Sequence, residues 1–141
     1  MSPETNKDLA VRFVTTMSDH GGPDERLITD DFAWWSSYHH GVMNIREIKA
    51  MIGDIALPPL KMEVIGLAAG DDRVAVEVQG RCELPDGRRY DNNYCFIVVI
   101  RYGRVCEMRE YCDTKLAADT FAIVDIAENT RKSAAKAAEP G

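Results

Sequence analysis

The strongest constraint on the fold is a run of long strand-like segments in the second half of the chain, each ending at a turn signal. These segments are residues 61–69, 73–83, 88–101 and 104–112. They alternate apolar and polar residues or are rich in β-branched and aromatic ones, as strands are. Pro85-Asp86-Gly87 and Tyr102-Gly103 are hairpin turn sequences. Short turns join antiparallel neighbours, so this half of the chain predicts a meander of paired strands.

The first half of the chain has helical periodicity instead. Leu9, Phe13, Val14 and Met17 recur at three- and four-residue spacing, which predicts a helix over residues 3–19, capped by Ser2 and ended by Gly21-Gly22. The later elements are expected at residues 24–28 (helix), 32–37 (strand), 45–55 (helix capped by Asn44) and 113–126 (helix). Helices followed by antiparallel strands indicate an α+β domain, a curved, mostly antiparallel sheet wrapped around N-terminal helices with a pocket at its open end.

Length and charge limit the remaining possibilities. A chain of 141 residues has room for one domain, which we expect over residues 1–127, with 128–141 as a frayed or disordered tail. The net charge of −6 disfavours nucleic acid as a partner. The longest apolar run, Cys95–Ile100, is too short to cross a membrane, and the N-terminus has no apolar signal segment.

The positions of the four cysteines indicate reduced thiols and no metal site. Cys82, Cys95, Cys106 and Cys112 all lie in apolar or alternating stretches, and none forms a C-x-x-C pair. We therefore expect reduced thiols that are mostly buried, a cytoplasmic location and no metal site.

Two acidic residues are the candidate acid/base groups. A two-residue turn at Tyr102-Gly103 would place Glu110 opposite Cys95. A turn at Asp86-Gly87 would place Glu77 opposite Phe96, or opposite Cys95 if Gly87 forms a bulge. The two carboxylates would then lie in one row, about 10 Å apart across three strands. If both face inward they share a pocket; alternatively one or both face solvent or pair with arginines.

Further candidate ligand-binding residues follow from strand alternation. Trp34, Ser36 and Tyr38 share one face, either as an aromatic pocket wall or as core. His39 and His40 point to opposite sides, so they make a poor metal pair, but one of them, with His40 as the candidate, could line the pocket mouth. Asn92 or Asn93 could donate a hydrogen bond to a ligand carbonyl, whereas Asp113 is better interpreted as a helix cap.

Longer motifs resemble a known family. GDDRVAVEVQG at 70–80, LPDGRRYDNNYCFIVVIRYGRVCEMREYCDT at 84–114, TDDFAWW at 29–35 and NIREIKAM at 44–51 are similar to the SnoaL-like, ketosteroid isomerase-related group of the nuclear transport factor 2-like superfamily. The resemblance spans residues ~5–125. It implies a cystatin-like, cone-shaped α+β barrel, commonly a dimer through the outer sheet face, in a superfamily of isomerases, polyketide cyclases, epoxide hydrolases, dehydratases and noncatalytic binders.

Two enzymes of this superfamily offer residue-by-residue comparisons. The ketosteroid isomerase residues fall at Phe13, Ser36 and Cys95, none of which supplies the required chemistry. The limonene-epoxide hydrolase residues fall at Glu77, Gln79, Glu110, Trp34 and Ser36, and of that set one acid, Glu110, is kept. Glu77 and Gln79 from this comparison, and Cys95 from the isomerase comparison, are among the candidate pocket residues.

The sequence thus predicts a SnoaL-like small-molecule enzyme with cofactor-free acid/base chemistry on a largely apolar or polyketide-like substrate. The reaction would be an isomerisation, cyclisation, dehydration or hydration, with Glu110 as the acid/base and Glu77 as its partner. The alternative is a noncatalytic ligand-binding or dimerisation module of the same fold. A homodimer is expected because both faces of residues 95–100 are apolar.

Overall fold

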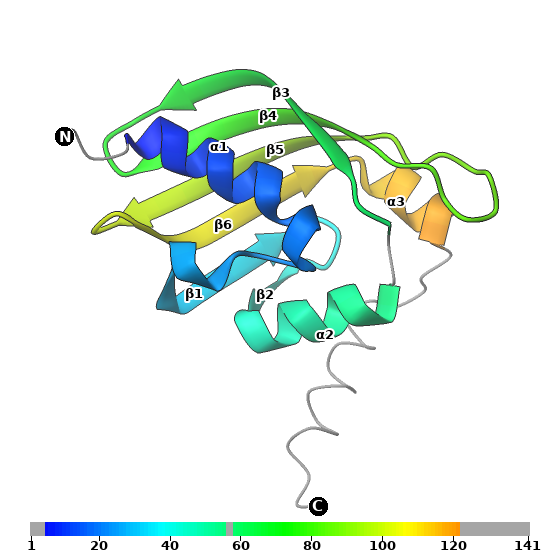
Figure 1. Ribbon diagram of the computed structural model, residues 1–141, viewed down its shortest axis with the longest axis horizontal. Coiled ribbons are helices and arrows are strands. Elements are labelled where there is room, and N and C mark those ends of the chain that lie inside the picture. The colour runs from blue at the N-terminus through cyan, green and yellow to red at the C-terminus, as the bar shows by residue number, and fades with distance from the viewer. Residues whose placement is uncertain (1–4, 56–57, 122–141) are drawn as a thin grey trace, which may run out of the picture.

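The computed structural model describes residues 5–55 and 58–121, which form three α-helices and six strands (Figure 1). The helices are α1 (Asn6–Thr16), α2 (Ile45–Ile55) and α3 (Thr114–Phe121), and two 3₁₀ turns, η1 (Ser18–His20) and η2 (Glu25–Leu27), follow α1. The strands are β1 (Ile28–Ser36), β2 (Gly41–Asn44), β3 (Lys61–Ala69), β4 (Arg73–Arg81), β5 (Asn92–Arg101) and β6 (Arg104–Cys112). The predicted α+β class is confirmed.

The strands form one curved, unclosed sheet in the order β2-β1-β6-β5-β4-β3. Neighbouring strands are antiparallel except β1 and β6, which are parallel. Helix α1 lies across the concave face, and α2 lies beside β1 and β2 (Figure 1). The core therefore lies between α1 and the inward side chains of the sheet, and the open end lies near α3.

Helix α1 forms because its apolar residues fall on one face and its first turn is capped. Leu9, Phe13 and Val14 are buried against the sheet. The Thr5 hydroxyl accepts a hydrogen bond from the backbone N–H of Asp8 at 3.1 Å. Thr5 is therefore the N-cap. The predicted cap, Ser2, lies outside the described residues.

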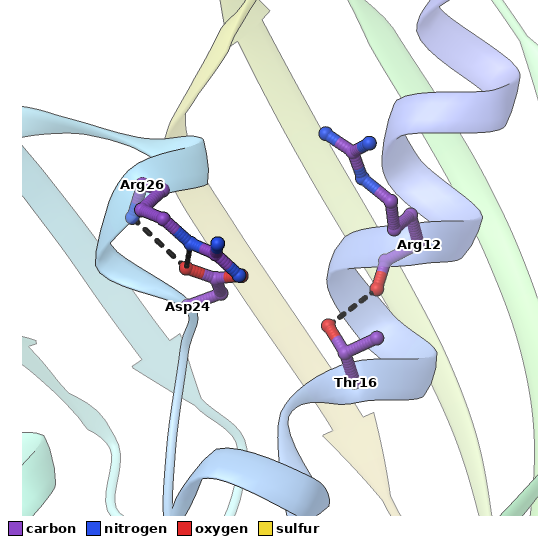
Figure 2. Close-up of polar contacts among 4 residues, drawn as sticks. All are labelled: Arg12, Thr16, Asp24 and Arg26. Carbon is purple, nitrogen blue, oxygen red and sulfur yellow. Dashed lines mark hydrogen bonds and ion pairs between the residues drawn. The ribbon is translucent and has the colours of Figure 1, made fainter.

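The chain leaves α1 through short local contacts. Near the helix end the Thr16 hydroxyl donates to the carbonyl of Arg12 at 2.6 Å (Figure 2). Asp24 then accepts from both the backbone and the guanidinium of Arg26, which fixes the turn into β1 (Figure 2). The cap predicted for α2 is confirmed, because Asn44 and Glu47 each accept from the other's backbone N–H, at 2.9 and 3.1 Å.

The register of the sheet departs from simple hairpin arithmetic at one point. Glu83 pairs with Arg89 around the Pro85-Asp86-Gly87 loop, where Gly87 has a φ of 88°, so Glu77 lies opposite Cys95. Between β5 and β6 a shift at Val99 and Ile100 inserts one extra residue. This bulge places Glu110 opposite Phe96, not Cys95, so the expectation that Glu77 and Glu110 share a row is wrong.

The other element boundaries differ by a few residues. Strand β5 begins at Asn92 rather than at residue 88, because the preceding residues form the loop. Strand β2 was not expected from the sequence. The end of the last predicted helix and the predicted tail, residues 128–141, lie outside the described residues. Within the described part of the chain, no helix is long and apolar enough to cross a membrane.

Candidate functional site

A cavity of about 190 Å³ is lined by residues of the sheet, the loop after α1, helix α2 and helix α3. Its walls are largely aromatic, thioether and aliphatic side chains. They comprise, among others, Met17, Trp34, Tyr38, Met51, Ile52, Leu60, Met62, Tyr90, Tyr94, Phe96, Ala117 and Phe121. Glu110 is the only acidic side chain among the described residues that line the cavity, and no Lys or Arg lines it.

Glu110 reaches the cavity because alternation along β6 points it inward. Met108, Glu110 and Cys112 share the concave face, and Tyr111 is exposed on the other side. Burial raises the pKa of Glu110 from 4.5 to about 7, and the hydrogen bond from Ser36 opposes the rise. A carboxyl group with this pKa exchanges its proton readily at neutral pH.

Ser36 fixes the orientation of this carboxylate. Ser36 is fully buried and pairs with Glu110 across the parallel β1–β6 ladder. The Ser36 hydroxyl accepts from the backbone N–H of Tyr38 at 3.1 Å and donates to Glu110 Oε2 at 2.9 Å. Among the described residues, Glu110 Oε1 has no hydrogen-bond partner, so this oxygen is available to a ligand.

The predicted aromatic wall also forms. Trp34, Ser36 and Tyr38 all line the cavity, as their alternation indicated. Trp34 is only 7% exposed, and its indole Nε1 is buried without a partner among the described residues.

The histidine at the cavity is His39, not His40. His40 is exposed and has a φ of 55°, which turns the chain so that the preceding side chain faces the cavity. Burial and, to a smaller extent, the charge of His40 lower the pKa of His39 to about 4. His39 is thus a neutral imidazole at neutral pH, and strand alternation could not indicate this because the chain has left the strand.

Glu77 does not join Glu110. It is exposed on the outer face of β4, and its carboxylate lies over Gly66 of the neighbouring strand. Its register partner Cys95 faces the same way, on the side opposite to Phe96. The two-carboxylate pocket is therefore absent among the described residues, and the cavity holds a single acid.

Gln79 and Asn92 are also not direct ligands of this cavity. Gln79 lies on the outer face with Glu77 and borders a separate polar depression. Asn92 is 1% exposed and its amide is fully used: Nδ2 donates to Tyr90 Oη at 2.8 Å and to the Asp113 carbonyl at 3.1 Å, and Oδ1 accepts from Asp113 N–H. Asp113 in turn accepts from Leu116 N–H and caps α3, as predicted.

The four thiols are free, but only Cys82 is fully buried, so burial is less complete than expected. Cys112 lines the cavity, where burial and the charge of Glu110 raise its pKa to about 12. A thiol with this pKa is a poor nucleophile. In the described part of the chain, no three His, Cys, Asp or Glu side chains lie close enough to hold a metal.

Sequence reasoning missed Tyr90 and Tyr94. Tyr94 stacks on Phe96 with ring centroids 5.3 Å apart, and Tyr90 packs edge-on against Phe121 at 4.7 Å. The alternation of Tyr94 with inward Phe96 was a usable signal for Tyr94, whereas Tyr90 lies in a loop that has no such periodicity.

Comparison with known proteins identifies the family. The SnoaL-like domain matches residues 10–108, which is most of the chain. The chain belongs to this family. The SnoaL-like family is the one that the sequence motifs predicted. No curated protein matches its sequence significantly.

Solved structures of low sequence identity share the fold. A protein described as a SnoaL-like polyketide cyclase from Jannaschia sp. CCS1 is 18% identical, with a TM-score of 0.61 over 86% of this chain and 96% of that one. A nuclear transport factor 2-like protein of unknown function from Burkholderia pseudomallei is 16% identical, with a TM-score of 0.66 over 84% and 98%. TerC, crystallised with polyporic acid, is 14% identical, with a TM-score of 0.63 over 81% and 98%.

Proposed function

We propose that this SnoaL-like protein is a small-molecule enzyme that performs acid/base chemistry without a cofactor on a largely apolar substrate. The reaction is an isomerisation, cyclisation, dehydration or hydration, and Glu110 moves the proton. The observation that carries the proposal is the carboxylate of Glu110 in an aromatic cavity, with its pKa raised to about 7 and Oε1 open to a ligand.

The contacts around Glu110 support this role. Ser36 holds Oε2 and keeps the side chain in one orientation, so Oε1 is presented to the cavity. At neutral pH both the acid and its conjugate base are populated, and one residue can take a proton from one substrate atom and return it to another. The neutral imidazole of His39 adds a polar contact on the same wall without adding charge.

The comparisons support a small-molecule ligand. One structural neighbour is described as a SnoaL-like polyketide cyclase, and another was crystallised with polyporic acid. The largely aromatic and aliphatic cavity of this chain suits an apolar small molecule. We also propose a cytoplasmic location, where four free thiols are stable, and a homodimer through the outer sheet face.

A thermal-shift screen against ketones, lactones, epoxides and polyketide-like compounds identifies the ligand. Turnover of the compound found is then measured for wild type, Glu110→Gln and the control Glu77→Gln. We expect Glu110→Gln to lower kcat by about 10²-fold or more, since the amide exchanges no proton, while the ligand still binds. Glu77→Gln should leave kcat unchanged because its side chain lies on the outer face.

The alternative is a noncatalytic ligand-binding module of the same fold. The observation that favours this alternative is that, among the described residues, the cavity holds one acidic side chain, so a mechanism that needs two carboxylates has no second group there. A ligand that binds in the cavity but is never turned over, with affinity equal in wild type and Glu110→Gln, would support this alternative.

A further inference from the structure

The cavity has an unbalanced charge. Among the described residues that line it, Glu110 is the one acidic side chain, and no Lys or Arg is present. Its histidine, His39, is neutral at neutral pH, because burial and, to a smaller extent, the charge of His40 lower its pKa to about 4. When Glu110 ionises, the cavity therefore carries a negative charge that no described lining residue balances.

The carboxylate of Glu110 is accessible to a ligand. Ser36 donates to Oε2 at 2.9 Å, and Oε1 has no hydrogen-bond partner among the described residues. The Glu110 side chain is half-buried, so part of its surface is open. Its pKa is raised by desolvation and not by a second acid, since Glu77 lies on the outer face. A positive charge beside Oε1 would offset this desolvation cost.

Aromatic rings lie next to this carboxylate on the sheet. Phe96 is the register partner of Glu110 on β5, and cross-strand partners have Cβ atoms about 5 Å apart. On β1, Trp34 and Tyr38 stand two residues before and after Ser36, and both line the cavity. The face of an aromatic ring attracts a cation within about 6 Å, and aromatic cages recognise alkylammonium groups in this way.

The charge pattern separates the classes of ligand. An anionic ligand would meet the ionised Glu110 without a described lining cation to bind it. A neutral apolar ligand would exclude water from Glu110 and leave its charge unpaired. A cationic group would instead pair with the carboxylate, and an apolar body would suit the rest of the wall. That wall includes the thioether and aliphatic side chains of Met17, Met51, Ile52, Leu60 and Met62.

We propose that the cavity binds a protonated amine with an apolar body, whose ammonium group lies against Glu110 Oε1 and the neighbouring aromatic rings. The inference rests on the proposed function in that it names the ligand class of the same cavity, but it requires no turnover. An N–H of the ammonium group donates a charge-assisted hydrogen bond to Oε1. Because the cation binds the ionised carboxylate, its binding releases the proton that Glu110 holds in the empty cavity.

This linkage can be measured because no other described side chain that lines the cavity titrates between pH 5.5 and 8.5. His39 titrates below this range. Burial and the charge of Glu110 raise the pKa of the Cys112 thiol to about 12. Burial also raises the pKa of the phenol groups that line the cavity, which are Tyr38, Tyr90 and Tyr94. The described lining residues of α2, α3 and the loop after α1 carry no titratable side chain.

The test compares two probes of nearly the same shape, phenyltrimethylammonium and tert-butylbenzene, in which a quaternary carbon replaces the charged nitrogen. The charge of the ammonium probe does not depend on pH, so a pH dependence of its binding comes from the protein. Both are titrated into the full chain at pH 5.5 and pH 8.5 at constant ionic strength, and the affinities are read from protein NMR shifts.

Three variants complete the experiment. Glu110→Gln removes the charge, and Glu77→Gln is the matched carboxylate control on the outer face. His40→Asn removes the exposed histidine beside the cavity, and asparagine tolerates the positive φ of 55° at this position.

In wild type, phenyltrimethylammonium should bind more tightly at pH 8.5 than at pH 5.5, by up to about 30-fold. This is the change in the ionised fraction of a carboxyl group with a pKa of about 7. tert-Butylbenzene should show no such increase, because an uncharged ligand gains nothing from ionised Glu110. In Glu110→Gln the affinity for the ammonium probe should be weak at both pH values, and both control variants should behave as wild type.

Three results in wild type would overturn the proposal, and none of them requires a folded variant. They are equal binding of the two probes at pH 8.5, an affinity for the ammonium probe that does not rise with pH, and no binding of this probe at about 10 mM. An affinity for the ammonium probe in Glu110→Gln equal to that of wild type at pH 8.5 would also overturn it.

The same measurements separate this proposal from the proposed function. If the two probes bind equally while Glu110→Gln loses turnover of the compound found by the screen, the cationic ligand is refuted and the acid/base function stands. A pH-dependent preference for the ammonium probe together with full turnover in Glu110→Gln would refute the acid/base function alone.

Discussion

Replacing Glu110 with glutamine should stabilise the protein in a way that depends on pH. The folded pKa is about 7 and the ordinary value is 4.5, so ionisation in the folded state is disfavoured by about 2.5 pKa units. At about 1.4 kcal/mol per pKa unit, ionising Glu110 costs the folded protein at most about 3 kcal/mol. This figure is an upper limit because Glu110 lines a cavity instead of a closed core. Glutamine keeps the oxygen that accepts from Ser36 and carries no charge to desolvate.

The direction of the pH dependence follows from the different pKa of Glu110 in the folded and unfolded chain. Below pH ~4.5 Glu110 is protonated in both the folded and the unfolded chain, and the group does not affect stability. Between pH 4.5 and 7 only the unfolded chain loses the proton, so the free energy of unfolding of wild type falls as the pH rises. Above pH ~7 the whole penalty is present.

Urea unfolding of wild type and Glu110→Gln at intervals from pH 5 to pH 8.5 measures the effect. The variant should gain at most about 0.8 kcal/mol over wild type at pH 5 and about 2–3 kcal/mol at pH 8.5. Glu77→Gln, an exposed carboxylate of the same sheet, is the matched control and should show no such pH dependence. A difference between wild type and Glu110→Gln that stays constant with pH would refute the assignment of a raised pKa to Glu110.

Three further outcomes are expected. Ser36→Ala removes the hydroxyl that donates to Glu110, so the pKa of Glu110 should rise further. The rise should appear as an alkaline shift in the pH profile of turnover or in an NMR titration of Glu110, and an unchanged profile would contradict a stabilising hydrogen bond from Ser36. Gly80→Ala places a methyl group 2.9 Å from the Tyr94 ring, so we expect a loss of about 1–3 kcal/mol in urea unfolding, and a neutral effect would show that the ring can move. Trp35 lies in the outer face of the sheet, and Trp35→Glu should convert the proposed dimer to a monomer of 15.8 kDa in light scattering; wild type that is already monomeric would refute the dimer.

Local patterns in the sequence determined most of the fold. The strand and helix periods and the turn residues predicted α2, β3 and β6 at their observed bounds. Alternation placed Trp34, Ser36 and Tyr38 on one face, because the period of two needs no information from other strands, and that face lines the cavity. The sequence left open whether Glu110 faces inward, and the structure shows that it does.

Only the tertiary structure decided which side chains meet across strands. The extra residue opposite Val99 and Ile100 shifted the pairing of β6 by one, and a shift of one residue moves a partner to the other face of the sheet. Glu77 was therefore separated from Glu110. The position of Tyr90 likewise depends on Asn92, which donates to the Tyr90 hydroxyl and also to the carbonyl of Asp113, 21 residues later in the chain. Local sequence patterns carry no signal for such contacts, because they form only when the loop, the strand and the last helix pack together.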